Sequence, residues 1–298
     1  MRKGDDLDDD FVVDELVALS EDEGSPELDD EFVADEPVEE GSNAEDGATV
    51  QNVSTDPKNS KKRKRREKEK ERKKRKLAQI VEAQPQGSIA MQSPESLSDY
   101  LASMQKKTFK DISEIELDDL RIPASAIVDT TLWTGPRTLD QLVEFIGKVL
   151  PTLRTRLLQR PKSTGAPTLI YVTSSALRVI DVTRILKDDK TLRGEKGGEV
   201  AKLFARHIKL AEHETYLSRT RVTAAPGTPG RIGKLLCETE SLSVSQLSHI
   251  ILDVTFRDSK KRNLLDIPEI RDEVFKTVLG APKMLKSIKE GKTKVVLF

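Results

Sequence analysis

The distribution of charge divides this chain of 298 residues into a part that can fold and a part that cannot. Residues 1–57 contain 21 acidic and 2 basic residues, whereas residues 58–76 contain 14 basic and 3 acidic ones. The remaining residues carry a net charge of +7, although the whole chain sums to −1. A segment with so much net charge and so few apolar residues cannot bury a core. We therefore predict a disordered acidic tail over 1–60 and a folded domain further along the chain.

A basic segment over 61–83 follows this tail, and glutamates placed four residues before cations favour a helix there. Such a block is typical of nuclear import signals and of contacts with nucleic-acid phosphates. It could equally be a solvated charge run without a partner, or an internal partner of the acidic tail. The residues expected to provide import or phosphate contacts are Lys61, Lys62, Arg63, Lys64, Arg65, Arg66, Lys73, Lys74, Arg75 and Lys76.

Several classes of protein are excluded by what the chain lacks. No apolar run approaches the ~20 residues of a membrane span, and the acidic N-terminus is unlike a secretory signal. Cys237 is the single cysteine, which excludes a disulfide framework and a cysteine-based zinc site. His213 and His249 have no ligand spacing, so we predict structural histidines, a buried cysteine and no metal. We expect an intracellular protein with neither a membrane nor a small-molecule substrate as its partner.

Apolar runs separated by helical patterns begin after a stretch rich in Gln, Ser and Pro, which we interpret as a linker over 84–108. The runs that predict strands are 168–173, 221–224, 249–253 and 295–298. Amphipathic spacing predicts helices at 139–150, 177–186, 200–210, 229–237 and 268–279. Strands that alternate with helices favour an α/β domain over 109–298, with a doubly wound and mostly parallel sheet.

The sharpest local signal is the turn Gly227-Thr228-Pro229-Gly230-Arg231, which joins a predicted strand to a predicted helix. A proline at an early helical position leaves backbone N–H groups free to bind an anion. Arg231 could add a bidentate contact to a phosphate. An ordinary strand-to-helix turn would use the same residues, so the turn alone does not decide between the two.

The order of motifs resembles the first RecA-like domain of DEAD-box RNA helicases. The stretch 173–178 lies where those helicases carry a Pro-Thr-Arg-Glu-Leu element that holds the RNA backbone, and 228–231 matches a second such element. The resemblance implies RNA contacts at Thr173, Ser174, Ser175, Arg178, Gly227, Thr228, Gly230 and Arg231. Arg206 and Lys209 lie in a basic stretch expected to be helical, which either faces phosphates or is plain helix surface.

The residues that a helicase uses to hydrolyse ATP are missing. A P-loop needs Gly-x-x-x-x-Gly-Lys-Ser/Thr; the stretch 133–138 has no lysine, and 291–293 precedes a predicted strand. Asp253 stands where Asp-Glu-Ala-Asp is expected, but Val254 replaces the glutamate that orients water. We expect no catalytic residue and no cofactor. Binding of a nucleotide without its hydrolysis is a third possibility. Phe256 could stack on a base or fill the vacant nucleotide cleft.

Within that superfamily, three ordered stretches are similar to the Cms family of small-subunit ribosome-biogenesis proteins: 203–209, 227–232 and 266–275. The resemblance covers roughly residues 109–298, and the acidic-then-basic head is also similar. It implies a protein of the nucleus and nucleolus that belongs to the early small-subunit pre-ribosome. The expected function is non-catalytic binding of pre-rRNA or an associated small nucleolar RNA, together with assembly proteins. The alternative is a protein-interaction scaffold without RNA contact.

Overall fold

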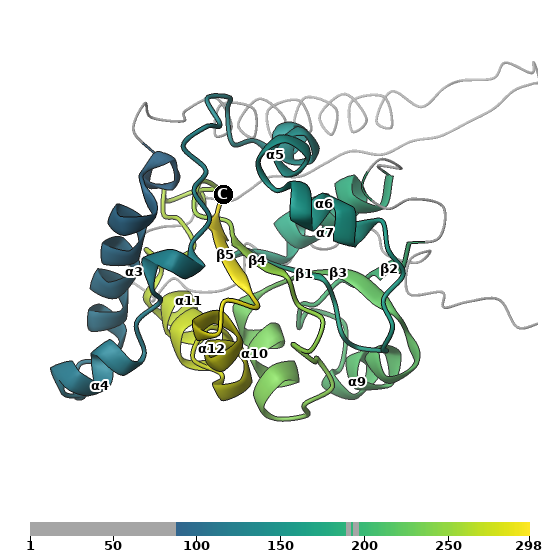
Figure 1. The fold of residues 1–298 in the computed structure, drawn as a ribbon. Coiled ribbons are helices and arrows are strands. Elements are labelled where there is room, and N and C mark those ends of the chain that lie inside the picture. Colours follow the sequence, from purple (N-terminus) through teal and green to yellow (C-terminus); the bar gives the residue numbers. More distant parts are fainter. Residues whose placement is uncertain (1–87, 189–191, 193–196) are drawn as a thin grey trace, which may run out of the picture. The chain divides into compact units, whose positions relative to one another are not determined.

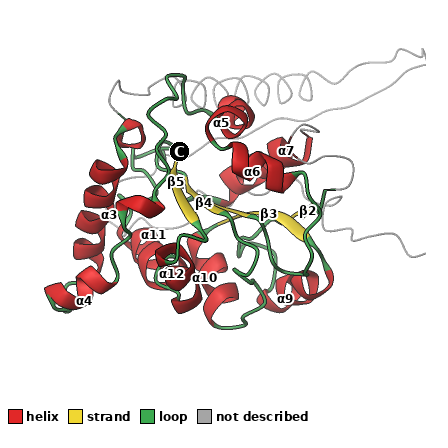
Figure 2. Cartoon of the chain, viewed as in Figure 1, coloured by secondary structure: helices red, strands yellow, loops and turns green. Residues whose placement is uncertain are grey.

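The structure is a computed structural model that describes residues 88–188, 192 and 197–298. The predicted acidic tail (1–60) and basic segment (61–83) lie outside the described residues. Within them, five parallel strands form one sheet in the order β2-β3-β1-β4-β5 (Figure 2). The strands are β1 (Leu169–Val172), β2 (Glu199–Val200), β3 (Val222–Gly227), β4 (His249–Leu252) and β5 (Lys294–Leu297). The three central strands are buried along their whole length, as in parallel sheets covered on both faces.

Helices cover both faces of this sheet (Figure 1). One face carries α5 (Leu142–Val149), α6 (Pro151–Leu157) and α7 (Ala176–Asp188). The other carries α9 (Leu210–Arg219), α10 (Pro229–Cys237), α11 (Pro268–Glu273) and α12 (Pro282–Lys289). Alternate strand residues supply the two cores, because Leu169 and Tyr171 pack toward α5 and α7 while Ile170 and Val172 pack toward α10 and α12. This arrangement confirms the predicted doubly wound α/β fold.

The direction of winding reverses at β1. From β1 the chain crosses by α7 to β2 on one side, and from β3 it crosses by α10 to β4 on the other side. Because such crossovers are right-handed, the two helices lie on opposite faces of the sheet. The carboxyl ends of β3, β1 and β4 therefore lie at a topological switch point, where open α/β sheets commonly bind ligands.

The predicted linker over 84–108 is corrected by the structure, because 94–108 forms helix α3 (Pro94–Thr108). The side chain of Ser93 accepts a hydrogen bond from the N–H of Ser96 and so caps this helix. The apolar residues that α3 buries in the core are Leu97, Leu101 and Met104. Their helical spacing was obscured by the Gln, Ser and Pro around them. The folded domain thus includes residues well before the predicted boundary at 109.

Four short elements lie before α3 or between α3 and α5. Helix α4 (Glu114–Asp119) begins with a capping box in which the side chains of Ser113 and Glu116 each accept from the other residue's backbone N–H. Single 3₁₀ turns are formed by η1 (Ile89–Met91), η2 (Ala124–Ala126) and η3 (Leu139–Gln141). The last of these runs directly into α5, which confirms the helix predicted at 139–150.

The helix predicted at 200–210 is wrong. After β2 the chain stays extended as far as Leu203, which forms a parallel bridge with Gly227. A Cβ on Gly227 would lie 2.6 Å from the Leu203 carbonyl oxygen, so glycine permits this close approach. The chain then turns at His207, whose φ is 61°, and becomes helical only at Leu210. A short apolar run cannot distinguish a buried extended segment from a helix by spacing alone.

Helix α10 begins and ends at the predicted residues, and α11 continues into a π-helical turn, η4 (Val274–Val278). The prediction that Cys237 is buried is wrong. Its side chain is exposed at the end of α10, with Sγ 3.4 Å from the carbonyl oxygen of Thr277. The core-facing side of α10 is instead formed by Ile232, Leu235 and Leu236.

The close packing of α10 on η4 depends on Gly233. A Cβ at this position would lie 2.6 Å from the Cβ of Thr277. We expect Gly233→Ala to lower the free energy of unfolding by about 1–3 kcal/mol, as overpacking of a core does. Urea denaturation measures the change, and Thr277→Ala in the same chain should recover part of it. An unchanged midpoint for Gly233→Ala would contradict the close approach.

Candidate nucleic-acid interface

Three of the segments predicted to bind RNA meet at the carboxyl edge of the sheet. Strands β1 and β3 are neighbours with Val172 opposite Gly227, so the segments that follow them emerge side by side. The N–H of Thr173 donates to the Gly227 carbonyl oxygen at 3.1 Å. On the other side of β3, the Leu203 carbonyl oxygen accepts from the Thr228 N–H at 2.9 Å. The structure thus brings together 173–175, 203–209 and 227–230, which we call the carboxyl-edge groove.

The segment after β1 offers its serines to the surface but not its threonine. Thr173 is fully buried, and its Oγ1 donates to Asp253 Oδ2 at 3.1 Å. Ser175 caps α7, since its Oγ accepts the N–H of Arg178 at 3.2 Å. Ser174 and Ser175 are half-buried at the start of this helix. Thr173 therefore supports the groove, and the two serines are the residues that a backbone ligand could reach.

Arg178 points into the protein rather than toward an RNA phosphate. Its Nε lies 2.8 Å from Asp253 Oδ2 and its Nη2 lies 3.4 Å from Oδ1. The two side chains are 10% and 0% exposed, so this ion pair is almost fully removed from water. The ring of Phe256 packs against the guanidinium at 4.6 Å. The guanidinium that the sequence suggested for an RNA contact is therefore bound to the Asp253 carboxylate in this structure.

A second buried guanidinium lies at the same edge of the sheet, beside the end of β5. Arg137, in the stretch where a P-loop would be expected, is 2% exposed. Its Nη1 donates to the Leu297 carbonyl oxygen at 3.1 Å, and its Nη2 donates to Thr130 Oγ1 at 2.9 Å. Its guanidinium also lies 5.1 Å from the centre of the Phe145 ring. Burial lowers the pKa of Arg137 to about 10. This buried cation is therefore satisfied by oxygens of the protein itself.

Arg231 supports a neighbouring loop. The side chain is 6% exposed, and its Nη2 donates to the carbonyl oxygen of Ile208 at 2.7 Å and lies 3.5 Å from that of Ala205. Nε and Nη1 are buried without a hydrogen-bond partner in the described part of the chain. Burial lowers the pKa of this guanidinium. The expectation that Arg231 clamps a phosphate gives way to a positioning role, because the guanidinium holds the loop that carries Arg206 and Lys209.

Arg206 and Lys209 are the cations that the groove presents to solvent. Arg206 is half-buried and Lys209 is exposed, on the loop between Leu203 and α9. Neither side chain forms an ion pair within the residues that the structure describes. The backbone N–H of Lys209 donates to Glu212 Oε2 at 3.1 Å, which caps α9 and orients the end of the loop. These two side chains could each reach a phosphate.

The backbone of Gly230, in the turn that the sequence suggested for anion binding, lies against a carboxylate. A Cβ on Gly230 would lie 2.6 Å from Oε1 of Glu273, the last residue of α11. The neighbouring residue Thr228 is at the N-cap of α10 and makes no side-chain cap of its own. Sequence reasoning missed Glu273 because nothing in the sequence links it to a turn that lies on a different element.

The two histidines judged structural from the sequence have structural contacts. His213 Nε2 lies 2.8 Å from the carbonyl oxygen of Lys202, and His249 Nδ1 lies 2.7 Å from Ser248 Oγ. Burial lowers the pKa of both to about 4, with help from nearby Arg231 for His213. Over the ranges that the structure describes, no three His, Cys, Asp or Glu side chains are grouped as metal ligands would be. None of the helices described there is long and apolar enough to cross a membrane.

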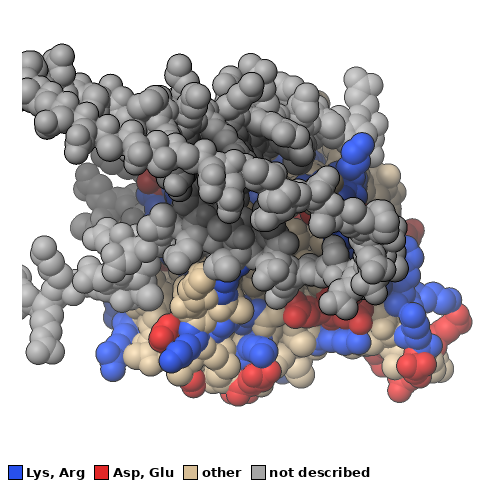
Figure 3. Space-filling view, turned by 180° about the vertical axis from the view of Figure 1, so that it is seen from behind, with Lys and Arg blue, Asp and Glu red and all other residues tan. Residues whose placement is uncertain are grey.

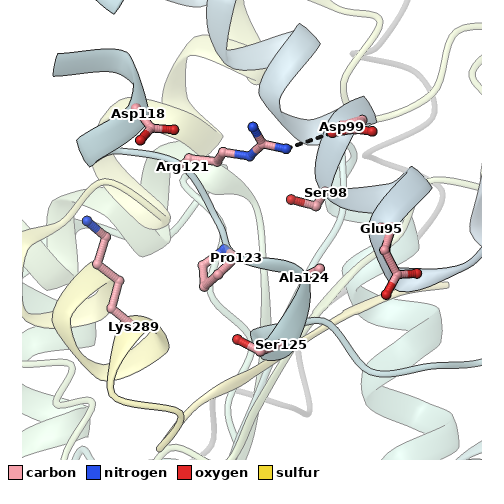
Figure 4. A pocket seen from close by; sticks show the side chains of 9 residues that line it. All are labelled: Glu95, Ser98, Asp99, Asp118, Arg121, Pro123, Ala124, Ser125 and Lys289. Atoms are coloured by element: carbon pink, nitrogen blue, oxygen red, sulfur yellow. Dashed lines mark hydrogen bonds and ion pairs between the residues drawn. The ribbon is translucent and has the colours of Figure 1, made fainter. Parts of the chain in front are cut away.

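A pocket beside α3, η2 and α12 shares no lining residue with the groove (Figure 4). It is lined by Glu95, Ser98, Asp99, Asp118, Arg121, Pro123, Ala124, Ser125 and Lys289. Arg121 Nη2 lies 2.6 Å from Asp99 Oδ1, and Lys289 donates to the carbonyl oxygen of Asp119. On the face shown in Figure 3, basic and acidic side chains are interspersed over the described residues.

The comparisons with known proteins agree with this description. The family model described as "CMS1: U3-containing 90S pre-ribosomal complex subunit" matches residues 42–298. The chain belongs to the CMS1 family. This confirms the family expected from the three ordered stretches and makes the chain a subunit of the 90S pre-ribosome in small-subunit biogenesis.

Relatives from several eukaryotes support membership of the CMS1 family. Protein cms1 of Schizosaccharomyces pombe is 35% identical over 221 residues, which are 74% of this chain and 76% of that protein. Protein CMS1 of Chaetomium thermophilum is 36% identical over 189 residues, or 63% of this chain and 73% of that one. Human protein CMSS1 is 29% identical over 209 residues, covering 70% and 68%. A solved DEAD box protein from Methanococcus jannaschii is 18% identical, with a TM-score of 0.33 over 54% of this chain and 37% of that chain.

Proposed function

We propose that this CMS1-family chain is a non-catalytic RNA-binding subunit of the small-subunit pre-ribosome, and that the carboxyl-edge groove holds single-stranded RNA by its backbone. The observation that carries this proposal is the convergence of three distant segments around two solvent-facing cations, Arg206 and Lys209. Phosphate contacts position an RNA without reading its sequence. An RNA of the U3-containing complex, either pre-rRNA or an associated small nucleolar RNA, is the ligand that the family description favours.

The absence of catalysis is part of the same proposal. In a hydrolysing enzyme the carboxylate at Asp253 would face Mg²⁺ and a cation near Arg137 would face phosphate. Here Asp253 is ion-paired with Arg178, and Arg137 donates to carbonyl oxygens and a hydroxyl. Opening either contact to admit a nucleotide would leave a buried charge without its partner, which costs several kcal/mol. These contacts support a binding module that does not use ATP.

The charged segments outside the described residues are assigned supporting roles in this proposal. The block 61–76 would direct the chain to the nucleus and add affinity that depends on salt. Membership of the 90S pre-ribosome supports a nucleolar location. If most of the affinity is electrostatic, binding to single-stranded RNA should fall steeply between 50 and 200 mM salt.

The groove is tested with the full chain carrying Arg206→Ala and Lys209→Ala. Each lost phosphate contact removes a cation, so we expect the double variant to reduce crosslinking of a 4-thiouridine oligoribonucleotide to 203–209 and 228–231 by roughly tenfold. Crosslinks to the block 61–76 in the same sample are the internal reference. Mass spectrometry of the crosslinked peptides at 150 mM salt measures both.

The matched control is Arg160→Ala with Lys162→Ala, which removes the same charge from exposed positions on the segment that leads into the amino end of β1. This variant should leave crosslinking in the groove within twofold of the unaltered chain. Equal losses in both double variants would show that only overall charge matters and would remove the groove assignment. Protein crosslinks at the groove without RNA crosslinks would favour the alternative, an interaction scaffold.

A further inference from the structure

The amino end of α10 lies against a side chain from another helix. A Cβ on Gly230 would lie 2.6 Å from Oε1 and 3.0 Å from Oε2 of the Glu273 carboxylate. Both carboxylate oxygens thus lie against the first turn of α10. Gly230 is required for this approach, because any side chain would displace the carboxylate.

The position that this carboxylate occupies is one where an anion is favoured. A helix N-terminus carries partial positive charge and free N–H groups, and it binds carboxylates and phosphates alike. The side chain of the N-cap residue Thr228 makes no capping hydrogen bond to this turn. Beneath the turn, Arg231 is 6% exposed, and its Nε and Nη1 have no partner among the described residues. The residues of the first turn of α10 therefore do not themselves neutralise its partial positive charge.

Glu273 is suited to leave this position. Its side chain is exposed at the end of α11, so moving the carboxylate into solvent does not open the core. Burial against α10 raises its pKa, whereas Lys234 and the Gly230 N–H lower it, so the carboxylate loses solvation in this position as well as gaining partners. The first turn of α10 offers only neutral N–H groups to the carboxylate, and a phosphate oxygen could accept from the same groups.

We propose that the Glu273 carboxylate is an internal substitute for an RNA phosphate and that RNA occupies the carboxyl-edge groove fully only by displacing it. This rests on the proposed function and adds its regulation. The carboxylate satisfies α10 when RNA is absent, and it repels a phosphate that approaches the same N–H group. Glu273 therefore sets the affinity of the groove below what Arg206, Lys209 and the α10 N-terminus would otherwise provide.

The test uses the full chain with Glu273→Gln and Glu273→Ala and the same 4-thiouridine oligoribonucleotide. Removing the competing charge is expected to tighten binding at the groove roughly three- to tenfold, from the usual strength of anions at helix N-termini. Crosslinks to 228–231 should rise relative to those of the block 61–76. Glu273→Gln should behave as Glu273→Ala does, because both remove the charge that repels the phosphate.

The matched control is Glu269→Gln, which removes a negative charge from another exposed residue of α11. It should change groove crosslinking by less than twofold. An equal rise with Glu269→Gln would show that only the general field matters, and this would overturn the proposal. A second outcome would overturn the proposal and keep the RNA groove. In it, Arg206→Ala/Lys209→Ala lowers the groove crosslinks, whereas Glu273→Ala leaves them unchanged or weakens them without changing the melting temperature. No groove crosslinks in any variant would overturn the groove and the substitution together.

Discussion

Replacing Asp253 with alanine is expected to lower the free energy of unfolding by about 3–5 kcal/mol, the usual cost of removing one partner of a buried ion pair. The Asp253 side chain is 0% exposed, and that of Arg178 is only 10% exposed. The substitution would leave the Arg178 guanidinium buried without its carboxylate and would also remove the acceptor of the Thr173 hydroxyl. Urea denaturation of the full chain, followed by circular dichroism, measures the loss.

An exposed ion pair is the control for this prediction. Asp272 and Lys276 lie 3.1 Å apart with side chains that are 37% and 48% exposed. Asp272→Ala should therefore cost less than about 1 kcal/mol. Combining Asp253→Ala with Arg178→Met should recover part of the lost stability, because the unpaired guanidinium is then also removed. If Asp253→Ala is no more costly than Asp272→Ala, the buried pair does not stabilise the carboxyl edge as we infer.

Acidification from pH 7 to pH 5 is expected to remove about 4 kcal/mol of stability through two buried histidines, roughly 2 kcal/mol each. Burial lowers the pKa of His213 and of His249 to about 4 in the folded chain, from an ordinary value of 6.5. The unfolded chain therefore takes up protons first as the pH falls. The stabilisation is complete above pH 6.5 and is lost progressively between pH 6.5 and pH 4.

Denaturation midpoints measured from pH 7.5 to pH 4.5 test this dependence. His213→Gln and His249→Gln should each flatten the profile, even where the variant is less stable at pH 7. His207→Gln is the matched control, because it replaces a histidine that is exposed on the loop before α9. Profiles that run parallel for all three variants would show that neither buried histidine is responsible.

The secondary structure was predictable wherever apolar spacing and boundary residues agreed. Pro229 at an early position and the apolar stripe to residue 237 located α10 at both ends. The strands β1 and β4 were evident as continuous apolar runs, because both of their faces are covered. The stretch 200–210 was mistaken for a helix, since its apolar residues line an extended segment beside β3 rather than one helical face.

The candidate site was less predictable than the fold. The motif order correctly indicated which segments come together, because the ends of neighbouring parallel strands lie at one edge. The direction of each side chain was not predictable. Arg178 and Arg231 sit in motifs that suggest phosphate contacts, yet a carboxylate 75 residues away and carbonyls 23–26 residues away bind their guanidinium groups.

The sequence by itself determined that the excess of acidic over basic residues lies in residues 1–57, that strand and helix patterns alternate in the later part of the chain, and that the chain belongs with the CMS1 family. Composition and local spacing suffice for these conclusions, because net charge and periodicity act over short stretches of chain. Only the tertiary structure decided which cations face solvent, and that the Glu273 carboxylate lies against the first turn of α10. A buried charge takes whichever partner the fold brings within reach, and that partner can come from anywhere in the sequence.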